Sequence, residues 1–342
     1  MLEIAILTIV IAFIFTFTNG FQDAAPIAAT FITSRSAQPR QAIVFVAAMV
    51  CLGALLGGTA VAFTLSGLLT TVSGGETVQV LLIAMIVATA WNILTWKYGL
   101  PSSSTHALIG GIVGAGIAAA GIGGVYWGVT DIIFPPHELA GIVKVLVFLV
   151  LSVIIGFAGS YCLHKAAGIL LRNSKRSINS RIMELNWMTA GAIGFGHGAN
   201  DSQKQLGIIA LALFAAGQSA SVTIPDWARV VCAVLMALGT IGGGWRIMNT
   251  LGNRIFRIEP IHSFDSQVFS GASIWISTLA GAPVSSNQII SSSILGVGAA
   301  ENPRKVHWFV GKDVVAAMFV TIPATALVSG FLYGIVFNLP GV

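Results

Sequence analysis

Two aspartates in this sequence lie inside apolar stretches and share the local pattern x-Gly-x-x-Asp. Asp201 belongs to the segment 196–204, which reads Gly-His-Gly-Ala-Asn-Asp-Ser-Gln-Lys, and Asp23 ends the segment 19–23, which reads Asn-Gly-Phe-Gln-Asp. An ionisable side chain costs about 2.5–3.5 kcal/mol to insert at the centre of a bilayer, so its repetition indicates a functional site. Carboxylate oxygens are hard ligands that suit a cation or a proton. We therefore predict that Asp23 and Asp201 bind a cation; the alternative is that they only cap backbone groups.

Amide and lysine side chains accompany the two aspartates. Asn19 and Asn200 can add neutral oxygen ligands for the same cation, and Asn200 and Gln203 can also donate to an anion. The alternative for these amides is hydrogen bonding between helices. We expect Lys204, three residues after Asp201, to compensate the charge of that aspartate rather than to contact an anion.

Two hydroxyl-rich segments each follow a Gly-x-Pro sequence. The first, 102–106, reads Ser-Ser-Ser-Thr-His after Pro101, and the second, 285–288, reads Ser-Ser-Asn-Gln shortly after Pro283. A helix that starts inside a membrane offers free N–H groups and a partial positive charge, which together can bind an anion without any arginine. The alternative is ordinary N-capping of two helices. The side chains predicted to bind an oxyanion are Ser103, Ser104, Thr105, Ser285, Ser286 and Asn287, with Asn200 and Gln203 as further donors.

The composition defines the environment of these residues. Of the 342 residues, 56% are hydrophobic and only 8% are charged, and the mean hydropathy is +0.89. A soluble domain has about 25% charged residues, so this chain is a membrane protein. Several uncharged runs exceed the ~20 residues that a spanning helix needs, and we expect about 10–12 membrane segments in all. The three cysteines are scattered and show no metal-binding spacing, so no resident metal or cofactor is predicted.

The distribution of charge assigns the two sides of the membrane. The formal net charge is +5, and the basic residues fall mainly on one side when successive loops are assigned alternately. The opposite loops, 72–77, 120–139 and 216–228, contain no lysine or arginine. By the positive-inside rule the basic side, with the central stretch 164–186, is cytoplasmic. This pattern excludes nucleic acid as a partner and predicts a multi-pass protein surrounded by lipid in the cytoplasmic (inner) membrane.

The motifs recur at nearly constant spacing. The aspartate motifs lie 178 residues apart, and the prolines of the hydroxyl-rich segments lie 182 residues apart. Near-equal offsets indicate an internal duplication, with a first repeat over 1–163, a basic linker over 164–186 and a second repeat over 187–342. The loop after Asp23 is basic and the loop after Asp201 is not, so the repeats face opposite ways. We predict an all-α polytopic membrane protein with an inverted-topology repeat, discontinuous helices and re-entrant helical hairpins, the architecture of a secondary transporter that works by alternating access.

Local features give three further expectations. Pro26 predicts a helix break near Asp23, and the matching motif predicts a second break at Asp201. His106, at the start of a helix, is a candidate proton relay, with a hydrogen-bonded packing role as the alternative. Asp265 is expected to be an exposed acid in a loop near the inner entrance.

At these residues the chain resembles the inorganic phosphate transporter (Pit) family. The segments 19–25 and 34–42 look like the family's first signature, and the segment 196–204 looks like its second. The segments 101–106 and 283–286 are similar to its paired hydroxyl-rich hairpins. The joint occurrence of these motifs is specific, whereas any one alone is weak.

The resemblance implies a function. Family members take up inorganic phosphate, many bacterial ones as a complex with magnesium or another divalent ion, and they act as homodimers driven by protons or sodium. By this resemblance, phosphate lies between the two hairpins with the two aspartates and the coupling ion close by. The chain departs from the family pattern at Pro26, where a second amide is usual, and at Asn287 and Gln288, where Thr-Thr-His is usual.

Two alternatives remain beside cation- or proton-coupled phosphate symport. One is transport of another tetrahedral oxyanion such as sulfate, which the neutral Asn287 and Gln288 favour. The other is a membrane-embedded sensor or enzyme without flux. The sequence contains no HExxH, no GxSxG and no clustered catalytic set, so we predict that the chain is not an enzyme.

Overall fold

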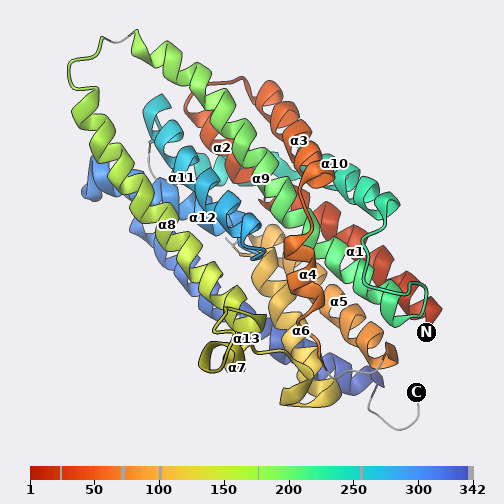
Figure 1. The fold of residues 1–342 in the computed structure, drawn as a ribbon. Helices are drawn as coiled ribbons and strands as arrows, with labels where there is room; N and C mark the ends of the chain where they lie inside the picture. Colours follow the sequence, from red (N-terminus) through yellow and green to blue (C-terminus); the bar gives the residue numbers. More distant parts are fainter. Residues whose placement is uncertain (24, 71–73, 100–101, 176, 255–256, 338–342) are drawn as a thin grey trace.

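The computed structural model describes residues 1–23, 25–70, 74–99, 102–175, 177–254 and 257–337, and these residues form a bundle of α-helices (Figure 1). Pro101 lies outside the described residues, as do Ala24 in the segment 19–25 and Arg176 in the linker 164–186. The helices in chain order are α1 (Leu2–Asp23), α2 (Ala25–Thr33), α3 (Pro39–Leu56), α4 (Ala60–Ser66), α5 (Gly74–Tyr98), α6 (Ser104–Ala120), η1 (Ile122–Gly124), α7 (Val129–Ile133), α8 (Gly141–Leu170), α9 (Ile178–Ala215), α10 (Asp226–Arg254), α11 (Pro260–Leu279), α12 (Ser286–Glu301), η2 (Pro303–Lys305) and α13 (Trp308–Phe337). The predicted all-α membrane architecture is confirmed.

Five of the described helices are long and apolar enough to cross a membrane. They are α1 up to Gly20, α3, α5, α8 and the part of α13 from Gly311. The more polar helices α9 and α11 pack against α3 and α8 respectively, and α10 packs against α1. Of these more polar helices, α9 carries the predicted site residues Asn200, Asp201, Gln203 and Lys204.

The first aspartate is the last residue of α1. α2 begins at Ala25, and Ala24 between the two helices lies outside the described residues. The break predicted near Asp23 therefore stays a prediction.

The second aspartate lies inside one continuous helix, so the break predicted at Asp201 is wrong. α9 runs without interruption over 38 residues, from Ile178 to Ala215. The position that matches Pro26 at the 178-residue offset is Lys204, whose N–H continues the helical hydrogen bonds. The glycines of the motif weaken a helix by only about 1 kcal/mol each relative to alanine, which does not interrupt it. One of them, Gly198, instead allows close packing, since an added Cβ would overlap the carbonyl oxygen of Val50 on α3.

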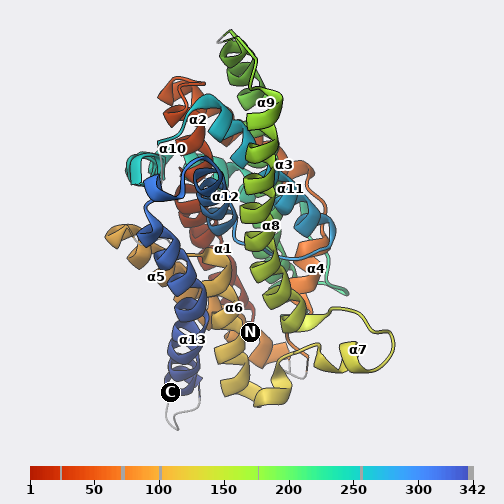
Figure 2. The same cartoon turned by 90° about the vertical axis from the view of Figure 1, so that its left-hand side faces the viewer.

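The two hydroxyl-rich segments form helical hairpins, as predicted. α5 and α6 form the first and α11 and α12 the second, and the turns contain Gly99 at φ +66° and Gly281 at φ +68°. Both glycines adopt a left-handed conformation that other residues rarely take. α6 and α12 then extend in opposite directions, with α12 above α6 in Figure 2. The N-termini of the two helices therefore point toward each other at mid-height in the bundle.

The helices that carry the aspartates run in opposite directions. In Figure 1, α1 rises from the N-terminus toward α2, whereas α9 descends beside it from the loop that follows α8. The linker predicted over 164–186 is helical at both ends, because α8 continues to Leu170 and α9 begins at Ile178. The opposite directions are consistent with an inverted repeat, which stays a prediction.

Asp265 is not an exposed loop acid, and that expectation is wrong. The residue lies in the second turn of α11 and is only 1% exposed. Its Oδ2 atom is 2.7 Å from Nδ1 of His164 on α8. Burial is tolerated because this histidine is a partner for the carboxylate.

Candidate functional site

The tips of the two hairpins are held together by hydrogen bonds. Thr105 Oγ1 donates to the carbonyl oxygen of Val284 at 2.8 Å, and Asn287 Nδ2 donates to the carbonyl oxygen of Ser102 at 3.3 Å. The side chains at these tips, including Ser103, are buried. The structure therefore brings the two predicted anion-binding segments into one place.

Asp23 meets the first hairpin and keeps one oxygen without a partner. Ser104 Oγ donates to Oδ2 of Asp23 at 2.5 Å. Oδ1 of the same carboxylate has no hydrogen-bond partner among the described residues, although Asp23 is 1% exposed. Buried polar atoms are nearly always paired, so an unpaired carboxylate oxygen indicates a place for a ligand.

Asp201, in contrast, has a full set of partners. Lys204 Nζ lies 2.9 Å from Oδ1, and Asn19 Nδ2 donates to Oδ2 at 3.1 Å. Ser286 Oγ lies 3.4 Å from Oδ1 and 3.0 Å from Nδ1 of His197. The predicted charge compensation by Lys204 therefore has the required geometry, and Ser286 contacts Asp201 as Ser104 contacts Asp23.

Lys204 joins both hairpins to α9. Besides Asp201, its Nζ atom donates to Thr105 Oγ1 at 2.5 Å and to the carbonyl oxygen of Val284 at 2.9 Å. The lysine is fully buried, so its charge depends on these three oxygen partners. Because proline occupies the matching position 26, the two halves differ: an ammonium group lies 2.9 Å from Asp201, and no ion pair to Asp23 is found within the described residues.

Asn200 and Gln203 hold helices together. Asn200 donates to Thr278 Oγ1 at 2.9 Å and to the carbonyl oxygen of Ala282 at 3.1 Å, and its Oδ1 atom accepts from the N–H of Val284 at 3.2 Å. Gln203 Oε1 accepts from the N–H of Val61 at 2.8 Å, in the first turn of α4. These contacts match the helix-packing role considered for both amides.

Several buried polar atoms around the hairpin tips have no partner in the described part of the chain. Oxygen atoms of this kind are Oδ1 of Asn19, Oδ1 of Asn287 and Oγ of Ser285, and a nitrogen is Nδ1 of His106. Ser103 caps α6 by accepting from the N–H of His106 at 3.2 Å, whereas the equivalent Ser285 makes no such bond to α12. Oxygen ligands for a cation and donors for an anion are thus present side by side.

Two buried amides also lack partners, and one of them, Asn92, was missed by the sequence analysis. Both side-chain polar atoms of Asn92 on α5, and both of Gln288 on α12, have no hydrogen-bond partner among the described residues. Asn92 lies one turn before Thr95, whose hydroxyl accepts from Gln22 at 3.2 Å. The available signal was an isolated amide within the apolar sequence of α5.

Comparisons with known proteins show which family this chain resembles. The model of the phosphate transporter family matches residues 19–184 and 171–329. A protein of Bacillus subtilis (strain 168) named "Probable low-affinity inorganic phosphate transporter" is 36% identical over 338 residues, which cover 97% of this chain and 97% of that protein. A protein of Rhizobium meliloti (strain 1021) with the same name is 36% identical over 328 residues, covering 95% of this chain and 94% of that protein. These relatives are named as transporters and not as enzymes.

One solved structure has the same fold. It is described as "The sodium-dependent phosphate transporter" and matches with a TM-score of 0.87 at 21% sequence identity. The match covers 98% of this chain and 100% of the other. The architecture of this chain is therefore one already seen in an experimental structure.

Proposed function

This chain belongs to the phosphate transporter family, and on that premise we propose that it carries inorganic phosphate across the cytoplasmic membrane together with a cation. The observation that supports this most is the meeting of two helix N-termini beside two buried carboxylates. A phosphate dianion cannot enter a low-dielectric site alone, because desolvation of its charge is too costly. A cation bound next to it offsets part of that cost.

We propose that phosphate binds between the hairpin tips. The ligands are the N–H groups at the starts of α6 and α12 and the side chains of Ser103, Ser104, Thr105, Ser285, Ser286 and Asn287. Ser285 carries the unpaired hydroxyl oxygen, and its rotatable O–H can donate to a phosphate oxygen. Asn200 and Gln203 then act by holding the second hairpin and α4 in position.

Asp23 is the proposed site of the exchangeable cation. Its free Oδ1 atom and the unpaired Oδ1 of Asn19 offer the hard oxygen ligands that a sodium ion or a proton needs. Asp201 already has Lys204, so we propose that this ammonium group takes the place of a second mobile cation. The name of the structural neighbour, a sodium-dependent transporter, supports sodium as the first cation to test.

The hydroxyl of Ser104 gives a physical link between the two substrates. In the structure this hydroxyl donates to Asp23 at 2.5 Å. A cation bound to the carboxylate satisfies its charge and releases the O–H to donate to phosphate. Cation binding then raises phosphate affinity, and by linkage phosphate raises cation affinity by the same factor.

Alternating access is the proposed transport cycle. The opposite directions of α1 and α9 and the opposed hairpins support two repeats that rock around a central site, with the basic segment 164–186 on the cytoplasmic side. A homodimer, and the carriage of magnesium or another divalent ion with phosphate, belong to the same proposal. His106, buried and with an unpaired Nδ1 among the described residues, is the candidate relay if protons drive uptake.

Uptake of radiolabelled phosphate into proteoliposomes tests this function. Imposed sodium and pH gradients, each with and without magnesium, identify the coupling ion, and protein-free liposomes are the control. We expect uptake under at least one gradient and none without protein. Absence of uptake under every gradient would exclude the proposal.

Sulfate is the second candidate substrate, because Gln288 offers an unpaired neutral amide where the family usually has histidine. Competition in the same assay separates the two anions. Under the phosphate proposal, an equal concentration of sulfate leaves phosphate uptake nearly unchanged. Abolition of phosphate uptake by equal sulfate would favour the broader oxyanion function.

A further inference from the structure

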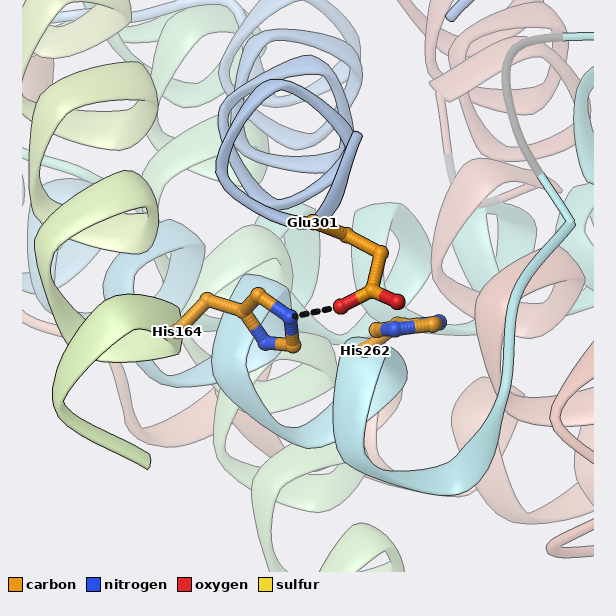
Figure 3. A group of neighbouring side chains, drawn as sticks. All are labelled: His164, His262 and Glu301. Atoms are coloured by element: carbon orange, nitrogen blue, oxygen red, sulfur yellow. Dashed lines mark hydrogen bonds and ion pairs between the residues drawn. The ribbon is translucent and has the colours of Figure 1, made fainter. Parts of the chain in front are cut away.

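A second cluster of ionisable side chains lies far from the hairpin tips. It consists of His164 near the end of α8, His262 in the first turn of α11 and Glu301 at the end of α12 (Figure 3). One ligand atom from each residue lies within 4.8 Å of the others. About 22 Å of helix separates Glu301 from the tip residue Ser286, so this cluster is distinct from the proposed phosphate site.

We propose that His164, His262 and Glu301 bind a divalent transition-metal ion of the zinc class. Two imidazole nitrogens and one carboxylate oxygen form a three-ligand set that zinc accepts, with water completing a tetrahedral arrangement. Imidazole ligands disfavour magnesium and calcium, which prefer oxygen. Figure 3 shows the Glu301 carboxylate above the ring of His262, with the ring of His164 to its left.

A buried carboxylate orients His164 for this role. Oδ2 of Asp265 lies 2.7 Å from Nδ1 of His164, and Nε2 of the same ring lies 3.2 Å from Oε2 of Glu301. With Nδ1–H donating to Asp265, Nε2 faces the centre of the cluster. Histidines that ligate metals commonly donate their other N–H to a carboxylate in this way.

Solvent access and the proton balance also fit an ion that enters from the aqueous side. The side chain of Glu301 is 50% exposed, whereas that of His164 is 9% exposed. Nε2 of His164 lies 3.2 Å from Oε2 of Glu301, and a metal ion bound to both atoms would take the place of any proton that they share. Metal binding therefore releases a proton to solvent and becomes stronger as pH rises.

Binding at His262 is coupled to the start of α11. Nδ1 of His262 accepts from the backbone N–H of Glu259 at 3.0 Å, within a capping box. If the metal binds Nε2, the ring proton moves to Nδ1, which can then no longer accept the N–H of Glu259. If the metal binds Nδ1, it takes the lone pair that accepts this N–H. In both cases metal binding breaks the capping hydrogen bond. Because α8, α11 and α12 pack against one another, the ion would tie the ends of three helices together.

Zinc titration of the full-length protein tests the proposal. The protein is purified in detergent without a histidine tag, and zinc binding is measured by calorimetry and by competition with a zinc indicator. We expect one zinc ion per chain and X-ray absorption typical of two imidazoles and oxygen ligands. His164→Ala and Glu301→Gln each remove a ligand and should weaken zinc binding by more than about 100-fold. Loss of a residue that only hydrogen-bonds to a ligand already costs about 10–100-fold in metal affinity.

Matched variants separate a metal site from a loss of folding. Glu301→Gln alters a half-exposed side chain, so this change should not disturb folding. Asp265→Asn removes no ligand but alters the partner of His164, and it should weaken zinc binding by about 10–100-fold. His137→Ala, at an exposed histidine outside the cluster, should leave binding unchanged. All variants must elute from size exclusion as the wild type does. Binding of less than one zinc per chain, or equal affinity in Glu301→Gln and the wild type, would overturn the proposal whatever the transport assay shows.

Discussion

Replacing Lys204 by methionine removes an ammonium group that three buried oxygen atoms share. The lysine and Asp201 are both 0% exposed, and Nζ lies 2.9 Å from Oδ1 of the aspartate. Removal of one partner from a buried ion pair costs about 3–5 kcal/mol, because the other charge remains without compensation. At about 1.4 kcal/mol per factor of ten, the ratio of folded to unfolded protein should fall by about 140- to 4,000-fold.

The double variant Asp201→Asn/Lys204→Met should recover most of this loss. Replacement of both partners removes the uncompensated charge, and neutral replacements of buried pairs are often nearly as stable as the pair. Equilibrium unfolding in mixed detergent micelles, followed by tryptophan fluorescence, gives the free energy of unfolding for each variant. The matched control is Lys97→Met, at an exposed lysine, which should stay within about 0.5 kcal/mol of the wild type.

Two results would refute the reasoning. One is a loss of less than about 1 kcal/mol in Lys204→Met, which is below the range for a broken buried pair. The other is a double variant no more stable than Lys204→Met. Either result would mean that Lys204 does not neutralise Asp201.

Three further variants test other contacts. Ser104→Ala removes the hydroxyl proposed to link cation and phosphate. KM for phosphate uptake should rise by at least about 10-fold, because a hydrogen bond to a charged group contributes about 1.5–3 kcal/mol. Gly198→Ala forces α9 away from α3 and should lower the free energy of unfolding by about 1–3 kcal/mol, whereas Gly58→Ala, with no atom within 4 Å of the new Cβ, should not. Gln203→Leu removes the acceptor for the first turn of α4 and should cost about 0.5–2 kcal/mol of stability while KM for phosphate stays unchanged.

The outcomes that contradict these expectations are equally specific. An unchanged KM in Ser104→Ala would remove that hydroxyl from the coupling step. Equal stability of the Gly198→Ala and Gly58→Ala variants would show that α9 and α3 can separate freely. A raised KM in Gln203→Leu with full stability would restore the phosphate-binding role that the sequence suggested for this amide.

Much of the site was predictable because its signals are local. Glycine before the hydroxyl-rich segments permits a left-handed turn, and the structure has Gly99 and Gly281 in that conformation. Hydroxyl residues after such a turn start the next helix, so the positions of Ser104 and Ser286 at two helix N-termini followed from the sequence. The repeated aspartates likewise indicated a buried functional centre.

The unbroken course of α9 was not predictable from the repeated motif alone. The motif is the same around Asp23 and Asp201, but the first copy is followed by Pro26, whereas lysine stands at the matching position 204. Lysine keeps its N–H, and α9 continues through the second copy. Proline removes an N–H, and glycine only lowers helix propensity.

Pairings between distant residues were also outside the reach of the sequence. His164 and Asp265 come from α8 and α11, and nothing in their local sequence indicates that they meet at 2.7 Å. Gln203 similarly contacts the start of α4, more than 140 positions earlier in the chain. Such contacts depend on how whole helices pack, which local patterns do not specify.

The most direct test of the account compares the wild type with Asp23→Asn in gradient-driven phosphate uptake by proteoliposomes. If Asp23 binds the cation that accompanies phosphate, the coupling gradient should accelerate uptake by the wild type, and Asp23→Asn should lose that acceleration. Asp23→Asn vesicles in which the same gradient accelerates phosphate uptake as strongly as in the wild type would contradict the account.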